Sequence, residues 1–179
     1  MLMGNRAAIL VEEDFDDAEL TEPMRALKDA GIKVIIVGSQ SNRSYRGKRH
    51  RVKIRSDVSA DEVSASEFDV IVIPGGYAPD KMRMYVSMVN LVKEADREDR
   101  IIAAICHGPQ MLISADIIRG RKVTSWPSVS VDLVNAGADW VDKPVVQDGN
   151  IITSRKAADI PRFNSAIIAA LKKRYKGTY

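Results

Sequence analysis

The chain has 179 residues, 45% of them hydrophobic and 28% charged, with a formal net charge of +3, which is the balance of a soluble globular protein. Its single cysteine and two histidines exclude an intramolecular disulfide and a structural zinc site built from Cys and His ligands. No apolar run approaches the roughly 20 residues that cross a bilayer, and residues 1–6 lack the pattern of a signal peptide. We therefore expect a cytoplasmic protein without a membrane partner.

Short apolar runs alternate with amphipathic segments along the first half of the chain. Residues 7–11 predict a buried strand, because the run is short and continuously apolar. Pro23 is expected to open or bend the helix that follows. Residues 33–37 predict a second buried strand, and residues 45–55 predict a hairpin that turns near Gly47.

The second half of the chain continues the alternation. Residues 69–73 and 101–105 predict buried strands, separated by a helix from about residue 82 to residue 96. Further strands are expected at 122–124, 145–147 and 150–153, and further helices at 129–135 and 160–174. Buried strands that alternate with helices form a mostly parallel sheet covered on both faces. We therefore expect an α/β fold, a flavodoxin-like three-layer sandwich, formed as one domain by residues 1–179.

Ligands of such sheets bind at the carboxyl ends of the strands, and three chemically notable segments meet there. They are the acidic stretch after the first strand, the loop at 74–76 and the segment 106–108. The acidic side chains are Glu12, Glu13, Asp14, Asp16, Asp17 and Glu19. Most are expected to be solvated. A carboxyl group that points inward would be desolvated, would have a raised pKa and could share a proton with a thiolate.

Cys106 is the expected reactive thiol, because it stands on a sharp turn between a buried strand and a helix. The free N–H groups and the dipole of the helix N-terminus predict a lowered thiol pKa. The same N–H groups, with those of Gly75 and Gly76, would stabilise an oxyanion. The small Ala104 before the cysteine and Gly108 after it are typical of a nucleophile elbow. We expect neither a metal nor a cofactor in this site.

The sequence leaves two kinds of base open for the thiol. One is His107, the neighbour of Cys106, and the other is a carboxylate from the acidic stretch. No histidine other than His107 lies downstream of the cysteine, which excludes the papain-like and class I amidotransferase arrangements. His50 is expected on the surface of the basic hairpin.

Residues 74–80, 104–110 and 136–142 resemble the corresponding segments of the PfpI family of intracellular cysteine peptidases and deglycases, within the DJ-1/PfpI superfamily. The resemblance covers nearly the whole chain. It implies that Cys106 is the nucleophile, that His107 is its catalytic partner and that Glu19 is the acid that hydrogen-bonds the thiol.

The resemblance also implies roles for residues around the nucleophile. Gly76 resembles an oxyanion-hole donor. Asp80 stands where the PfpI branch has a Glu that reaches across an oligomer interface to the neighbouring subunit's His, and it is one methylene shorter. Trp126 stands where that branch often has Tyr, so substrate contacts are expected to differ. A homo-oligomer, a dimer or a hexamer, is therefore expected.

Three functions follow from the resemblance. The first is chemistry on reactive carbonyls, either glyoxalase III-like conversion of methylglyoxal to lactate or removal of early methylglyoxal adducts. The second is peptide hydrolysis, although no extended groove is evident. The third is a redox sensor or stress chaperone in which Cys106 is oxidised to a sulfinate. The partner is accordingly a small carbonyl compound, or a glycated or peptide substrate.

Positive charge gathers in two stretches, residues 43–55 and residues 172–176. No aromatic-rich stacking surface accompanies them, as single-strand binding would require. We interpret them as a solvated hairpin and a helix C-terminus, and we do not expect a nucleic-acid partner.

Overall fold

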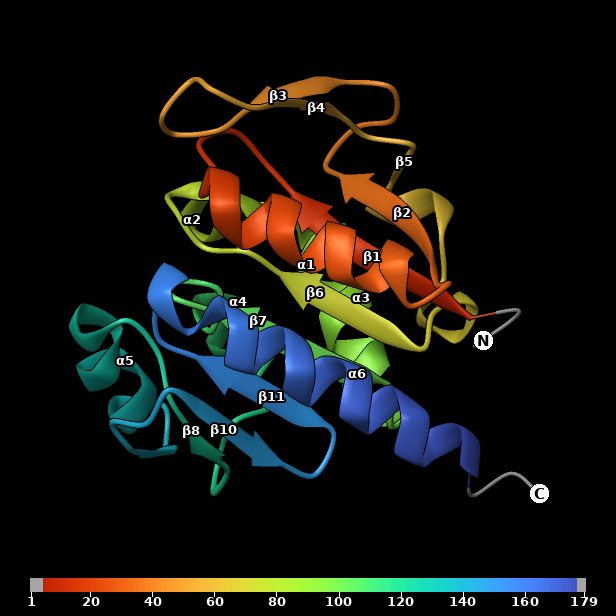
Figure 1. Ribbon diagram of the computed structural model, residues 1–179. Coiled ribbons are helices and arrows are strands. Elements are labelled where there is room, and N and C mark those ends of the chain that lie inside the picture. Colours follow the sequence, from red (N-terminus) through yellow and green to blue (C-terminus); the bar gives the residue numbers. More distant parts are fainter. Residues whose placement is uncertain (1–4, 177–179) are drawn as a thin grey trace.

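A computed structural model describes residues 5–176 and shows a seven-stranded sheet between two layers of helices (Figure 1). In spatial order the strands are β10 (Val145–Asp148), β11 (Ile151–Ser154), β7 (Ile101–Ile105), β6 (Val70–Ile73), β1 (Arg6–Val11), β2 (Lys33–Gly38) and β5 (Val58–Ser59). Residues 1–4, on which the expectation about a signal peptide partly rests, lie outside the described part, as does the side chain of Lys176 in the basic tail.

The central strands are parallel, and their order is that of the flavodoxin fold. Going across the sheet, β2, β1, β6, β7 and β11 pair in parallel. Numbered among themselves in chain order, these five strands have the doubly wound order 2-1-3-4-5. The register places Ala7 between Val34 and Val70. Among the seven strands of this sheet in residues 5–176, only β10 is antiparallel, joined to β11 by the hairpin at Asp148 and Gly149. The predicted fold class is confirmed.

Helices cover both faces of the sheet (Figure 1). The long helices α1 (Asp17–Asp29) and α6 (Ile160–Lys176) pack together on the front face. The opposite face carries α3 (Val86–Arg97), which contacts β7, together with α4 (Gln110–Ser114). The remaining helices are α2 (Ala78–Met82), α5 (Ser130–Asn135) and the single-turn helices η1 (Ala60–Glu62), η2 (Ala65–Glu67), η3 (Pro127–Val129) and η4 (Ala157–Asp159). None of the helices in the described residues is long and apolar enough to cross a bilayer.

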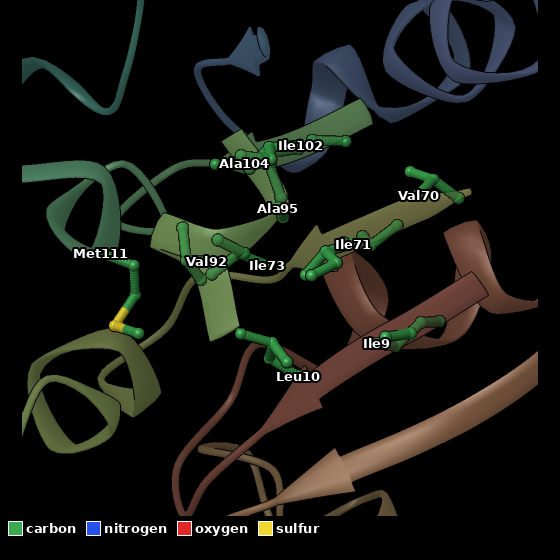
Figure 2. Packing of buried hydrophobic residues seen from close by; sticks show 14 of the residues in the cluster. Ile9, Leu10, Val70, Ile71, Ile73, Val92, Ala95, Ile102, Ala104 and Met111 are labelled. Atoms are coloured by element: carbon green, nitrogen blue, oxygen red, sulfur yellow. The ribbon is translucent and has the colours of Figure 1, made fainter. Parts of the chain in front are cut away.

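The core lies on both sides of the central strands. Every residue of β6 and β7 is buried, which explains why these strands are continuously apolar rather than alternating. Figure 2 shows Val92 and Ala95 of α3 among strand side chains such as Ile71 and Ile73. Burial of this kind contributes about 0.8 kcal/mol for each methylene group removed from water. The carboxyl ends of the strands are therefore held on a rigid layer.

Two helices differ from their predicted bounds. α1 begins at Asp17, six residues before Pro23, because the Asp16 side chain caps it by accepting hydrogen bonds from the N–H groups of Ala18 and Glu19. Pro23 lies inside this helix and does not open it. The single helix expected from residue 82 to residue 96 is instead α2 and α3, separated by residues 83–85.

The basic hairpin is longer at its turn than predicted and folds back onto the sheet. Its strands β3 (Ser44–Arg46) and β4 (Lys53–Arg55) pair antiparallel and are joined by the loop 47–52. The N–H of Lys48 donates to the carbonyl of Phe15 at 2.8 Å, and Gly47 forms a bridge to the same residue. The loop is thus fixed beside the carboxyl end of β1. A second small sheet pairs β8 (Lys122–Val123) with β9 (Asp139–Trp140).

Candidate active site around Cys106

Cys106 stands directly after β7 in a left-handed backbone conformation, with φ of 62°. This conformation is strained for a residue with a Cβ atom, and it costs of the order of 1 kcal/mol or more. Two backbone hydrogen bonds hold it: the Cys106 N–H donates to the carbonyl of Ser154 at 3.0 Å, and its carbonyl accepts from Trp126 N–H at 2.9 Å. A Cβ atom at Gly108 would lie 2.5 Å from the carbonyl oxygen of Ile73, so the turn requires glycine there. This is the geometry of a nucleophile elbow.

Glu19 meets the cysteine from the first turn of α1. Its side chain is buried, its Oε2 accepts a hydrogen bond from the N–H of Gly75 at 2.9 Å, and its carboxyl group lies beside the Cys106 side chain. A Cβ atom at Gly75 would lie 2.5 Å from Glu19 Oε2 and 2.7 Å from Cys106 Cβ. The absence of a side chain at residue 75 therefore lets the carboxyl group and the cysteine approach each other.

Burial makes Glu19 and Cys106 a coupled acid–base pair. Burial and the charge of Asp16 raise the pKa of Glu19 to about 7. Burial and the charge of Glu19 raise the pKa of Cys106 to about 12. A protonated Glu19 carries no charge that opposes the thiolate. Loss of one proton can therefore leave either a carboxylate beside a thiol or a carboxylic acid beside a thiolate. The first titration step thus belongs to the pair rather than to either residue.

The raised pKa of Cys106 corrects the expectation that a helix N-terminus lowers it. The helix α4 begins only at Gln110, and the capping position is occupied by Pro109, so the thiol does not lie at a helix N-terminus. The N–H groups of Gly76 and His107 do hydrogen-bond the sulfur and lower its pKa, but burial outweighs them.

Lys48 brings a positive charge to the pair from the hairpin loop. Its Nζ forms an ion pair with Asp16 Oδ2 at 2.8 Å. Burial would raise the pKa of Asp16, but hydrogen bonds from Lys48 and from the N–H groups of Glu19 and Ala18 lower it below its usual value. Burial would likewise lower the pKa of Lys48, but Asp16 raises it. The charged Lys48 favours the ionised forms of both Glu19 and Cys106.

His107 lies on the other side of the thiol. Its Nδ1 is 3.3 Å from Cys106 Sγ. Burial and the charge of Lys48 lower the pKa of His107 below 6.5, so the imidazole is neutral at pH 7 and can accept a proton. Its ring stacks on the indole of Trp126, with centroids 6.4 Å apart and an interplanar angle of 24°. The stack fixes the plane of the imidazole.

These groups open into a cavity of about 430 Å³. Its lining includes Cys106, His107, Glu19, Gly76 and Trp126. The sequence predicted all five as site residues, and the structure brings them together. Within the described residues, no group of three His, Cys, Asp or Glu side chains is placed to hold a metal ion.

Three predicted site residues do not face this cavity. The N–H of Gly75 is taken by Glu19, and the N–H of Gly108 donates to the carbonyl of Ile105 at 2.8 Å. Neither is therefore free to bind an oxyanion, and both glycines act by allowing close approach. Asp80 lies exposed on α2 and is not part of the cavity lining in this chain.

The acidic stretch is less solvated than expected. Glu12, Asp16 and Glu19 are all buried. Asp17 is half-buried, and its side chain accepts hydrogen bonds from the N–H groups of Arg49 at 3.3 Å and Val52 at 2.9 Å. Asp17 and, through its ion pair with Lys48, Asp16 hold the hairpin loop in place, whereas Glu12 accepts a hydrogen bond from the Ser39 hydroxyl.

The sequence reasoning missed several cavity residues. They are Lys48, Arg49, Tyr77, Lys156, Ala157 and Ala158, whereas Asp16 was among the carboxylates considered as the base. Lys48 and Arg49 belong to the stretch interpreted as a solvated hairpin, and only the folding of its loop onto Phe15 brings them to the site. His50, by contrast, is exposed as predicted.

Comparisons with known proteins agree with the resemblance seen in the sequence. A family model described as the DJ-1/PfpI family matches residues 5–170. General stress protein 18 of Bacillus subtilis is 41% identical over 173 residues, which are 96% of this chain and 100% of that protein. Protein/nucleic acid deglycase 2 of Escherichia coli is 38% identical over 170 residues, which are 94% of this chain and 99% of that protein.

A solved structure shows the same fold. It is a two-domain protein from Anabaena variabilis that contains DJ-1/ThiJ/PfpI-like and ferritin-like domains. The TM-score is 0.93 at 45% sequence identity, and the match covers 94% of this chain. The present chain spans about half of that protein, 48% of its length.

Proposed function

Because the chain belongs to the DJ-1/PfpI family, we propose that it is an enzyme in which Cys106 attacks reactive carbonyl compounds, as a glyoxalase or a deglycase. The similar protein from Escherichia coli carries the name deglycase. The chemistry proposed for this chain rests on its own cavity and on the groups around the thiol.

The observation that carries the proposal is the close approach of the Glu19 carboxyl group to Cys106 beside Gly75. A thiol whose pKa is raised to about 12 carries little charge at neutral pH, so it needs a base in contact with it. Glu19, with a pKa near 7, can take the thiol proton and give it back during one reaction cycle.

Methylglyoxal illustrates the proposed steps. Cys106 Sγ forms a bond to the aldehyde carbon while the thiol proton passes to Glu19. The resulting alkoxide is held by the N–H groups of Gly76 and His107 and takes the proton back, which gives a hemithioacetal. The neutral imidazole of His107 then moves the proton of that carbon to the neighbouring carbonyl carbon, through an enediolate, while the hydroxyl proton passes to the oxygen of that neighbouring carbon. The product is a lactoyl thioester, which water hydrolyses to lactate and the free thiol.

Deglycation uses the same first intermediate. In an early adduct the aldehyde carbon of methylglyoxal carries a hydroxyl group and the nitrogen of an amine. Cys106 replaces the amine, which leaves with the proton that Glu19 has taken from the thiol. The hemithioacetal then proceeds to lactate as before.

The test is lactate formation from methylglyoxal without glutathione, by the wild type and by Cys106→Ser side by side. The proposal predicts lactate from the wild type alone. The matched control is Ser128→Ala, an exposed residue in η3 outside the cavity lining, which should retain activity. Lactate from Cys106→Ser would remove the thiol from the mechanism, and lactate from neither protein would remove glyoxalase chemistry.

Peptide hydrolysis is a second candidate because a further hollow adjoins the cavity. This hollow has a volume of about 300 Å³ and shares Asp16, Arg49 and Ala157 with the first. Together they would accept a longer substrate than the sequence suggested. Peptide cleavage that is lost in Cys106→Ser, without lactate formation, would favour this candidate. Peroxide oxidation of Cys106 without either activity would favour the redox sensor.

The proposal extends to the setting of the enzyme. It includes a cytoplasmic location and a homo-oligomer, dimer or hexamer, in which Asp80 contacts His107 of another subunit. The exposed position of Asp80 on α2 supports this arrangement. Sedimentation analysis tests it, since a monomer that is fully active would exclude the contact. In an active oligomer, Asp80→Ala should lower kcat.

A further inference from the structure

The cavity over Cys106 has unbalanced positive charge at its rim. Its lining contains the cations Lys48, Arg49 and Lys156 and the carboxyl groups of Asp16 and Glu19. Lys48 is paired with Asp16. Arg49 and Lys156 form no ion pair within residues 5–176, and no hydrogen bond from either side chain is found there.

The two unpaired cations come from separate parts of the fold and meet at the same cavity. Arg49 lies in the loop 47–52 of the basic hairpin, and Lys156 lies between β11 and η4. Both are exposed, so water reaches them in the free protein. Arg49 also lines the adjoining hollow, and it therefore stands between the thiol cavity and that hollow.

A neutral molecule such as methylglyoxal gives these cations no partner. A carboxylate or a phosphate fits them, because the planar guanidinium of Arg49 can bind two oxygens of such a group and Lys156 adds a second charge. On the buried side of the cavity the cation is Lys48, and its charge is already neutralised by Asp16.

Resting on the proposed function, we infer that the substrate is a carbonyl compound or adduct that also carries an anionic group, and that Arg49 and Lys156 bind this group. They determine specificity and do not take part in the proton transfers. Loss of one exposed charge contact is expected to weaken recognition about fivefold.

A chemical probe tests the anion site without any turnover. Iodoacetate and iodoacetamide both alkylate the thiol, forming the bond from sulfur to the methylene carbon and releasing iodide, but only iodoacetate is charged. Cys106 is the single cysteine, so the rate reports this site alone. The ratio of the two rates cancels changes in thiol reactivity that affect both reagents.

The wild type should show a higher iodoacetate to iodoacetamide ratio than free cysteine does. The ratio should fall about fivefold in Arg49→Gln and in Lys156→Gln. The matched control Lys53→Gln removes the same charge from β4 outside the cavity and should leave the ratio unchanged. An equal fall in the control, or no fall in the two variants, would overturn the inference.

Turnover distinguishes the source of the anion. Methylglyoxal adducts of Nα-acetylarginine are compared with those of its amide, for a carboxylate, and adducts of guanosine monophosphate with those of guanosine, for a phosphate. The anionic member of at least one pair should have the higher kcat/KM, and Arg49→Gln should remove the difference. Equal kcat/KM within both pairs would overturn the inference even if lactate forms. Failure to turn over any adduct, with the alkylation ratio as expected, would overturn the proposed function and leave the anion site standing.

Discussion

The carboxyl group of Glu19 in α1 and the side chain of Cys106, which follows β7, meet beside Gly75, where a side chain would collide with both residues. Glu19 is 1% exposed as a residue, so the ionisation of its carboxyl group is governed by the protein and not by water. The site therefore depends on α1, the loop after β6 and the turn after β7, which meet at the carboxyl edge of the sheet.

The raised pKa of Glu19 predicts how stability depends on pH. The folded protein binds this proton more tightly than the unfolded chain does, with a pKa of about 7 against an ordinary 4.5. The stabilisation is fully present below the unfolded value and is lost as pH rises through about 7, at a cost of about 3 kcal/mol. Thermal unfolding from pH 4 to pH 8 should therefore show a larger loss for the wild type than for Glu19→Gln. Parallel curves would contradict this burial of Glu19.

Gly75 should be essential for activity rather than for folding. In Gly75→Ala the new methyl group would collide with Glu19 Oε2 and Cys106 Cβ, which must separate. We expect lactate formation to fall by at least about tenfold, since the proton transfer depends on contact. Gly120→Ala is the control, because φ there is +73° and no atom lies within 4 Å. It should cost about 1 kcal/mol of stability and leave kcat unchanged. Full activity of Gly75→Ala would show that the contact is dispensable.

Lys48→Met should slow the reaction of the thiol. It removes the cation that favours the ionised forms of Cys106 and Glu19, and it leaves the buried Asp16 carboxylate with backbone partners alone. The expected effects are several-fold slower alkylation of Cys106 at pH 7 and a loss of about 1 to 3 kcal/mol of stability. Alkylation rates and denaturant unfolding measure them. Lys53→Met removes an equal charge from the same hairpin and should change neither, so equal effects in both variants would assign the result to net charge.

The indole ring of Trp126 should contribute to activity by stacking on the imidazole of His107. Trp126→Ala removes the partner on which the imidazole of His107 stacks, an interaction of about 0.5 to 1.5 kcal/mol. We expect kcat/KM to fall by up to about tenfold, whereas Trp126→Phe should keep most of the activity. The rate of Cys106 alkylation should be unchanged in both. Equal kcat/KM for the alanine and phenylalanine variants would exclude the stack as the cause.

The fold could be predicted because its central strands carry a strong local signal. The runs that became β1, β6 and β7 are continuously apolar, as strands covered on both faces must be. Pro23, expected to open or bend the first helix, does not open it, and the start of α1 at Asp17 was therefore not predicted. The spacing of Asp16 and Glu19, which fits an N-cap followed by an acid in the first turn, was the better indicator.

The site could be predicted only in part. Cys106 stands out as the sole thiol beside an unusual turn, but nothing local separates Glu19 from the other acids, and the family resemblance singled it out. Lys48 was missed because its approach depends on contacts between the hairpin loop and Phe15, which no pattern in the loop reveals. The direction of the thiol pKa was missed because burial is a property of the folded chain.

The central claim is that Glu19 and Cys106 share one proton, and the pH dependence of Cys106 alkylation by iodoacetamide tests it most directly. In the wild type the rate should rise through an inflection near pH 7, where the pair loses its first proton. In Glu19→Gln this inflection should be absent, because only the thiol titrates. The same inflection near pH 7 in both proteins, or its absence from the wild type, would contradict the shared proton.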